Sequence, residues 1–264
     1  MQKNYNSRSF HLFRNYITYS ILVVIIGIAL QYGVFSVMAV RQKMKMFDQE
    51  VDAALLSVNE RHMDPVLVDL FKEKVFLETR FQMSKADSIS LSINLKDSIL
   101  QLELKGVVIK STKITDFEVD QFLYQLKPAT YQHLFGRQSQ VKSYSSTISK
   151  VPIVVKKAPK DTTEAQALSV KIDSVKSEVV HWMLKLDKEI ILKIEGSDPY
   201  FRSHWWIGQK FWLREDMNSF KNFKETIRFK VPEYYPEIRL VISESDAKAI
   251  YRALPAKPLV GIRL

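Results

Sequence analysis

The chain of 264 residues contains no cysteine and only 7 glycines. Without cysteine it cannot build a thiolate nucleophile, a disulfide, a zinc-thiolate site or an iron–sulfur cluster. So few glycines leave no loop of the kind that cradles phosphate groups. The 5 histidines are scattered without the spacing of metal ligands, so we expect neither a metal nor another cofactor. These absences remove several classes of catalytic chemistry.

Positive charge predominates, with 39 Lys and Arg against 29 Asp and Glu and a net charge of +10. Such a balance suits a surface that meets anionic lipid, acidic glycans or nucleic acid. Because the next feature places most of the chain beyond a membrane, we expect no nucleic-acid partner.

Residues 17–40, ITYSILVVIIGIALQYGVFSVMAV, form an apolar run without Asp, Glu, Lys or Arg. At about 1.5 Å per residue, a helix of this length reaches across the roughly 30 Å of hydrocarbon in a bilayer. Such a helix also satisfies its own backbone hydrogen bonds in lipid. We therefore predict a transmembrane helix over residues 17–40, which makes the membrane the first expected partner.

Two alternatives to an uncleaved anchor stay open. A signal peptidase could cut after Ala39, because Val37-Met38-Ala39 supplies side chains of suitable size. The apolar run is longer than the roughly 7 to 15 residues of a typical signal-peptide core, however, which favours a signal anchor. A buried helix of a soluble protein is the other alternative, and such helices rarely stay apolar for so long.

The flanking charges do not orient the span, because three cations stand on each side of it: Lys3, Arg8 and Arg14 before it, and Arg41, Lys43 and Lys45 after it. The preceding segment has no acidic residue, and a long following domain crosses a membrane largely regardless of its charge. We predict a cytoplasmic tail over residues 1–16 and a periplasmic or extracellular location after residue 40, in a single-pass protein of the cytoplasmic (inner) membrane.

Residues 41–84 carry the pattern of a helical stalk. Apolar residues recur at spacings of four, three and four, at Phe47, Val51, Ala54 and Val58. The same spacing fits heptad positions a and d, so a homodimer through the stalk is left open. Pro65 interrupts the pattern and begins a second predicted helix, which ends near Phe81.

From residue 85 to residue 264 the pattern predicts a β-rich domain. SISLSINL, SILQLEL and VVIKSTKI alternate apolar and polar residues, with turn signals at Lys96-Asp97 and Lys105-Gly106. WMLKLDKEIILKI predicts a further hairpin. Between them, residues 138–177 are rich in Ser, Thr, Lys and Gln, and we expect a flexible, solvated insertion there.

Aromatic residues concentrate after that hairpin, at Tyr200, Phe201, Trp205, Trp206, Phe211 and Trp212. If exposed, they would bind the faces of sugars or a membrane interface; if buried, they would form the core of a small β domain. The sequence alone favours the core.

The C-terminal segment PEIRLVISESDAKAIYRALPAKPLVGIRL resembles the end of the L,D-transpeptidase (YkuD-type) catalytic domain, which cross-links peptidoglycan through a cysteine acyl-enzyme. Ile238-Arg239-Leu240 matches the part of the family motif that follows the cysteine. Asp246-Ala247 and Ile250-Tyr251 match its short helix, and Pro258-Leu259-Val260 matches its closing strand. SINLKDSILQLELKGVVIKSTKI is similar to the family's opening strands. The similarity covers residues 88–114 and 179–264.

The chain departs from this family at the chemistry. Glu237 stands at the position of the nucleophile, Pro236 precedes it in place of glycine, and the required His-Gly is missing from residues 217–235. A carboxylate cannot replace the thiolate that attacks a peptide carbonyl and later leaves. Other carboxylate pairs, such as Glu233 with Glu237, are expected by chance among 29 acidic residues. We therefore expect no catalytic residue and no enzyme activity.

These features together predict an α+β protein with one N-terminal transmembrane helix, a helical stalk, and a mainly β, sandwich-like and YkuD-like extracytoplasmic domain with a short C-terminal helix. We expect a scaffold that binds peptidoglycan or an envelope protein, with a sensory or adaptor subunit as the alternative. The degenerate site would comprise Glu237, Ile238 and Arg239. Candidate binding residues are Arg239, Trp205, Trp206, Trp212, Tyr234 and Tyr235.

Overall fold

The fold is described from a computed structural model, which describes residues 5–51, 64–150, 180–197, 211–212, 224 and 228–264. The chain divides into two compact units. One comprises residues 1–50 and 215–234, and the other comprises residues 51–214 and 235–264. We call the second unit the β domain.

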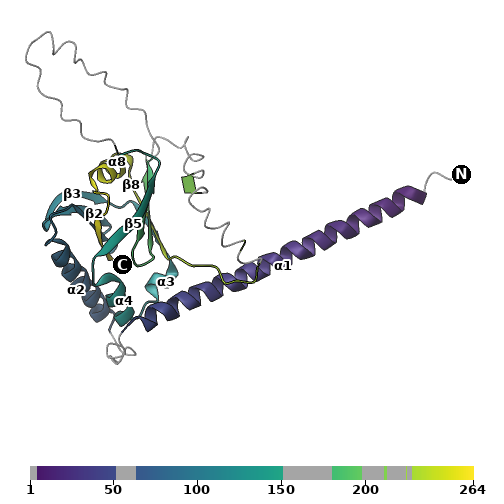
Figure 1. The fold of residues 1–264 in the computed structure, drawn as a ribbon, viewed down its shortest axis with the longest axis horizontal. Coiled ribbons are helices and arrows are strands. Elements are labelled where there is room, and N and C mark those ends of the chain that lie inside the picture. The colour runs from purple at the N-terminus through teal and green to yellow at the C-terminus, as the bar shows by residue number, and fades with distance from the viewer. Residues whose placement is uncertain (1–4, 52–63, 151–179, 198–210, 213–223, 225–227) are drawn as a thin grey trace, which may run out of the picture. The chain divides into compact units, whose positions relative to one another are not determined.

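In the first unit, α1 (Tyr5–Gln49) is one continuous helix of 45 residues (Figure 1). Its part from Tyr19 to Gln49 is long and apolar enough to cross a membrane, by length and composition. The predicted span of residues 17–40 lies inside α1. The helix continues beyond that span to Gln49, because Met, Lys and Gln at its end all favour helix.

In the β domain, α2 (Pro65–Met83) follows the expectation for the second predicted helix. Asp64 caps it by accepting a hydrogen bond from the backbone N–H of Val66 at 3.0 Å, and Pro65 fits the first helical position, where no donor is needed. Arg80 of α2 forms an ion pair with the buried Glu103, with Nε to Oε1 at 2.9 Å. Most of the predicted stalk between α1 and α2 lies outside the described residues.

One mixed sheet of nine strands forms the body of the β domain, in the order β3-β2-β1-β9-β5-β6-β7-β8-β4. The strands are β1 (Ser90–Asn94), β2 (Ile99–Leu104), β3 (Val107–Lys113), β4 (Asp116–Val119), β5 (Ser139–Ser146), β6 (His181–Leu186), β7 (Ile191–Ser197), β8 (Glu237–Ser243) and β9 (Leu259–Arg263). Two of the pairings are parallel, β1 with β9 and β7 with β8. The chain therefore forms an α+β protein with an apolar N-terminal helix.

The predicted hairpins are present. β1 pairs with β2 and β2 with β3, both antiparallel, and β6 pairs antiparallel with β7. The turn before β3 needs Gly106, which has φ +80° and lies so close to Ser84 that an added Cβ would meet the Ser84 Cβ at 3.0 Å. The pattern of alternating apolar residues thus correctly located these five strands.

β5 links the two halves of the sheet. Its start pairs with β9 through Ser139 and Gln140, and its end pairs with β6 through Val141 to Ser146. The two halves are therefore parts of one continuous sheet. We expected a flexible insertion from residue 138, and this start is wrong, because residues 139–146 form a strand whose Val141 is buried. Residues 151–179 of the expected insertion lie outside the described residues.

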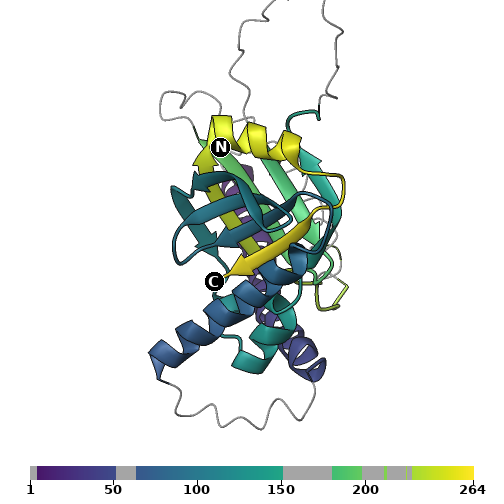
Figure 2. The same cartoon turned by 90° about the vertical axis from the view of Figure 1, so that its left-hand side faces the viewer.

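Helices cover the sheet at opposite ends of the domain (Figures 1 and 2). Toward one end, α2 packs against β9 and α4 (Pro128–Phe135), and the short α3 (Gln121–Tyr124) precedes α4. Toward the other end, α8 (Glu244–Ala253) packs against β7 and β8. Ser243 caps α8 by accepting from the Asp246 N–H at 3.2 Å.

The core lies on the face of β6, β7 and β8 that α8 covers. Trp182, Ile194, Ile238 and Leu240 are fully buried, and the Trp182 ring lies 5.7 Å from that of Tyr251 on α8. Because successive residues of a strand point to opposite faces, the residues between them point away from this core. That outward face of β6, β7 and β8 carries the candidate site.

Candidate functional site

The residue at the expected nucleophile position begins β8. Glu237 is half-buried and shares the outward face of the sheet with Arg239, whereas Ile238 between them is fully buried in the core. Ile238 is therefore a packing residue. Of the three residues in the predicted degenerate site, only Glu237 and Arg239 are available for contact on the outward face.

Glu237 and Arg239 belong to a set of four alternating charges on two neighbouring parallel strands. Lys193 and Glu195 of β7 supply the other two, and Lys193 lies level with Arg239 in the register. The Lys193 Nζ donates to Glu237 Oε2 at 2.7 Å. The Arg239 Nε and Nη2 donate to Glu195 Oε1 and Oε2 at 2.9 and 2.8 Å. We call these four residues the ion-pair ladder.

Arg239 is the most strongly held member of the ladder. Its bond to Glu195 is bidentate, the geometry in which a guanidinium and a carboxylate match best. Glu118 of β4 adds a longer contact, at 3.6 Å from Arg239 Nη1 to Oε2. The hydrogen bonds to Glu195, reinforced by the nearby charge of Glu118, raise the pKa of Arg239 and keep it cationic.

Two aromatic residues lie against the ladder. Lys193 Nζ lies 5.3 Å from the centre of the Trp212 ring, within the range of a cation–π interaction. Trp212 and Phe211 in turn contact His181 of β6, with ring centres 5.7 and 6.4 Å from the imidazole. Phe211 is 5% exposed and Trp212 is half-buried. The aromatic segment therefore contributes packing at Phe211 and a partly exposed ring at Trp212.

His181 is largely buried under these rings. Burial lowers its pKa, the nearby Glu195 acts in the opposite direction, and Arg239 adds to the lowering. Its Nδ1 is buried, and among the described residues it finds no hydrogen-bond partner. His181 therefore belongs to the same electrostatic environment as the ladder.

The geometry does not make His181 a base for Glu237. His181 lies level with Glu195, and Glu195 with Val241, so Glu237 is two strands away and four residues along. At about 3.3 Å per residue and about 4.8 Å between strands, their Cα atoms are roughly 16 Å apart. A proton cannot pass directly between side chains at that distance.

The other carboxylates considered from the sequence have structural roles or lie apart. Asp246 belongs to the cap of α8 and bonds to Lys110 Nζ at 2.6 Å. Burial acts to raise the pKa of Asp246, but hydrogen bonds from Lys110 and Ser243 outweigh it and lower the pKa. Glu233 lies in the other unit. Within the described ranges, no three His, Asp or Glu residues lie close enough together to hold a metal ion.

The remaining predicted binding residues are only partly placed. Trp205 and Trp206 lie outside the described residues. Tyr235 is half-buried just before β8, and Tyr234 is half-buried in the first unit. The structure therefore brings Glu237, Arg239 and Trp212 together from the predicted set.

Sequence reasoning missed Lys193, Glu195 and His181. A signal for the first two exists in ILKIEG, where Lys and Glu alternate with Ile as Glu and Arg do in PEIRLVI. The parallel pairing of β7 with β8 turns the two alternating patterns into one ladder. Pairing between strands so far apart in the chain cannot be read from either pattern alone.

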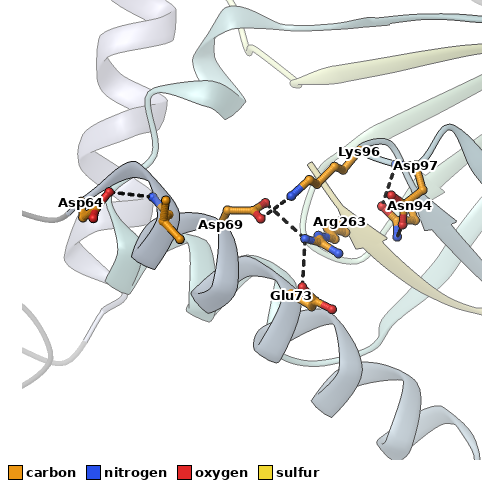
Figure 3. Close-up of polar contacts among 8 residues, drawn as sticks. Asp64, Asp69, Glu73, Asn94, Lys96, Asp97 and Arg263 are labelled. Atoms are coloured by element: carbon orange, nitrogen blue, oxygen red, sulfur yellow. Dashed lines mark hydrogen bonds and ion pairs between the residues drawn. The ribbon is translucent and has the colours of Figure 1, made fainter.

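A second charged cluster holds the end of the chain to α2 (Figure 3). Arg263 of β9 is 6% exposed at its side chain, and its Nη2 lies 3.2 Å from Asp69 Oδ1 and 3.5 Å from Glu73 Oε2. Lys96 in the turn after β1 also bonds to Asp69. The hydrogen bond from Lys96, with that from Arg263, lowers the pKa of Asp69. We call these four residues the Arg263 cluster.

Comparisons of the chain with protein families, with curated proteins and with solved structures give no match.

Proposed function

We propose that the protein is a single-pass, membrane-anchored envelope protein whose β domain is a catalytically silent L,D-transpeptidase-like module that binds peptidoglycan or an envelope partner. α1 would anchor it in the cytoplasmic membrane, with the N-terminus inside and the β domain outside. The length and apolar composition of α1 support the anchor. The ion-pair ladder supports a binding role for the β domain.

The observation that carries the proposal is the bond from Lys193 to Glu237. In the family that the C-terminal segment resembles, a nucleophile would stand at residue 237. Here the side chain at that place is an anion with a lysine 2.7 Å away. A carboxylate held by a cation is a much weaker nucleophile toward a peptide carbonyl than a thiolate is. The surface is better suited to recognition than to reaction.

The ladder offers both signs of charge to a ligand. A peptide that carries a carboxylate and an amine could exchange partners with it, with the carboxylate on Arg239 and the amine on Glu237, the two members whose side chains are the most exposed. Arg239 is 48% exposed at its side chain, so an incoming carboxylate can reach it, whereas its present partner Glu195 is 14% exposed. Trp212 beside Lys193 adds an aromatic face of the kind that stacks on sugars or on cations.

Binding of the full-length protein, purified in detergent, to isolated sacculi and to soluble stem peptides tests this proposal. Arg239→Ala should weaken binding at least tenfold, because it removes the fork that receives the carboxylate. Glu195→Gln should strengthen binding or leave it unchanged, because it releases the guanidinium from its present partner. Opposite effects from two members of one ion pair distinguish recognition from loss of fold.

Arg252→Ala is the matched control, because Arg252 is an exposed arginine on α8. It should leave binding unchanged. If Arg239→Ala binds like the wild-type protein while its circular dichroism is also unchanged, the ladder is not the binding surface.

A sensory or adaptor subunit is the second candidate, favoured by the continuity of α1 from Tyr5 to Gln49. An unbroken helix can carry a rotation or a shift through the membrane. Cysteine substitutions at Phe47, Val51 and Val58 would report pairing of stalks in membranes. Cross-linking that changes when cell-wall synthesis is inhibited would favour the sensor, and unchanging cross-linking together with binding to sacculi would favour the scaffold.

A further inference from the structure

α2 presents apolar residues on two faces, and among the residues of the β domain that the structure describes, only one of these faces is packed. Val75, Phe76 and Met83 are buried on the face that packs against β9 and α4. The exposed face carries five large apolar side chains between 51% and 65% exposed: Val66, Leu67, Leu70, Leu77 and Phe81. Exposed apolar residues gathered on one helix face mark an interaction site more often than single scattered ones.

The spacing of this face fits a helical partner. Leu67, Leu70, Lys74, Leu77 and Phe81 follow one another at intervals of three, four, three and four. That is the spacing of a and d positions over two heptads, which lie along one seam of a helix. We call these five residues the α2 seam.

The charges in and beside the seam are complementary to each other. Lys74 is the one cation within it, and Glu73 and Glu78 flank it, with side chains 45% and 49% exposed. Two such seams related by a two-fold axis would bring the two Lys74 side chains together at the centre, where each also lies near the glutamates that flank the other. A polar residue at a single a position also fixes the register of paired helices.

We propose that the α2 seam is a two-fold interface with a second copy of this chain. The area is sufficient. With roughly 100 Å² offered by each of five large side chains, two copies would bury about 1,000 Å² in total, the lower bound for a specific interface. The same stripe serves both partners, as an isologous two-fold contact requires.

A lipid surface is the competing occupant, and the charges argue against it. An amphipathic helix that lies on an anionic bilayer borders its apolar face with Lys and Arg. The apolar face of α2 has its lysine in the middle and glutamates on its borders. Anionic headgroups would repel those borders, whereas Lys74 of a second copy would add to the ion pairs that Glu78 makes with Lys74 at 3.8 Å and Glu73 with Arg263 at 3.5 Å within one chain.

Cysteine cross-linking of the full chain gives a direct test, because the sequence has no cysteine of its own. Leu70→Cys and Leu77→Cys, alone and mixed, should form disulfide dimers in native membranes under mild oxidation. Tyr124→Cys on α3 is the matched control, since Tyr124 is 52% exposed and Leu77 is 51% exposed. The seam positions should cross-link at least fivefold more than this control.

Two further variants distinguish a second copy of the chain from a bilayer as the partner of the α2 seam. Leu77→Glu should weaken the dimer at least tenfold in analytical ultracentrifugation of the detergent-solubilised protein, and Lys74→Leu should strengthen it. Tyr124→Glu should change nothing. Cross-linking at the seam equal to the control, or a dimer unaffected by Leu77→Glu, overturns the proposal.

Binding of the same variants to anionic vesicles identifies lipid as the occupant if the seam variants change vesicle binding and leave the dimer unchanged. That result also overturns the proposal. Membrane fractionation reports the anchor separately, so failure of the dimer and failure of the proposed anchoring are distinguishable.

Discussion

Arg239 and Arg263 both contact two carboxylates, yet they lie in opposite surroundings. Arg239 on β8 is 48% exposed at its side chain and makes a tight fork with Glu195 at 2.8 and 2.9 Å. Arg263 on β9 is 6% exposed and makes looser contacts with Asp69 and Glu73, at 3.2 and 3.5 Å. Bond length and burial therefore rank the two arginines in opposite orders.

Burial affects the role of an ion pair more than bond length does. Water competes for the half-exposed Arg239, so the fork is open to a ligand on the arginine side, although Glu195 is 14% exposed. Arg263 has almost no access to water, so removal of its partners would leave a charge in poor solvation. The Arg263 cluster also joins α2 to β9, elements from the two ends of the β domain's sequence (Figure 3). We therefore assign a structural role to Arg263 and a ligand-binding role to Arg239.

The largest expected effect is on stability at Arg263. Arg263→Ala should lower the free energy of unfolding by about 3 kcal/mol, because it removes a buried guanidinium and the packing of its stem. Arg239→Ala should lower it by less, because Arg239 is itself 48% exposed, although the variant leaves Glu195 without its bidentate partner. Denaturant unfolding of the detergent-solubilised chain, followed by tryptophan fluorescence, measures both.

Arg252→Ala on the surface of α8 provides the baseline for the loss of any arginine. Equal losses of unfolding free energy in Arg239→Ala and Arg263→Ala would contradict this assignment. The fork of Arg239 would then contribute as much stability as the contacts of Arg263.

A buried lysine should make the stability of the fold depend on pH. Lys188, in the turn between β6 and β7, donates to the backbone carbonyl oxygens of Leu134 and Arg137. Burial lowers its pKa to about 8. An unfolded lysine keeps a pKa of about 10.4, so between these values the unfolded chain binds a proton that the folded chain does not. Stability should therefore rise with pH in this window.

From pH 7.5 to 9.5 we expect a gain of about 2 kcal/mol in the free energy of unfolding, which Lys188→Met should abolish. Lys105→Met is the control, because Lys105 is 63% exposed at its side chain. The pKa of the buried Tyr131 is raised to about 12, and it becomes relevant only above this range. A rise that persists in Lys188→Met would show that the proton belongs to another group.

Much of the fold follows from local patterns in the sequence. The alternation in SISLSINL and the Lys105-Gly106 turn located β1 to β3, and Pro65 located the start of α2. β5 was missed because SQVKSYSS has one buried apolar residue, Val141, and reads as a solvated segment. Its place in the sheet comes from two neighbours, β9 and β6, that are distant in the chain.

The residues of the candidate site were likewise predicted only in part from the sequence. Glu237 and Arg239 were found because they sit beside the residues that resemble a family motif. Lys193, Glu195 and His181 were missed because they enter the site only through strand pairing. The burial of Ile238 follows from alternation along β8, and that inference was available from the sequence.

The smallest expected effect concerns His181, which lies beside the aromatic neighbours of the ladder. Burial lowers the pKa of His181 below 6.5. Below pH 6.5 the unfolded chain therefore takes up a proton before the folded chain does, and stability falls as pH falls. One proton limits the slope to about 1.4 kcal/mol per pH unit.

His181→Phe should flatten the profile between pH 4.5 and 6.5, whereas His133→Phe, at an exposed position on α4, should not. Trp212 touches the imidazole, so its fluorescence should change in the same pH range in the wild-type protein. A profile that His181→Phe leaves intact would show that another group takes up the proton in this pH range.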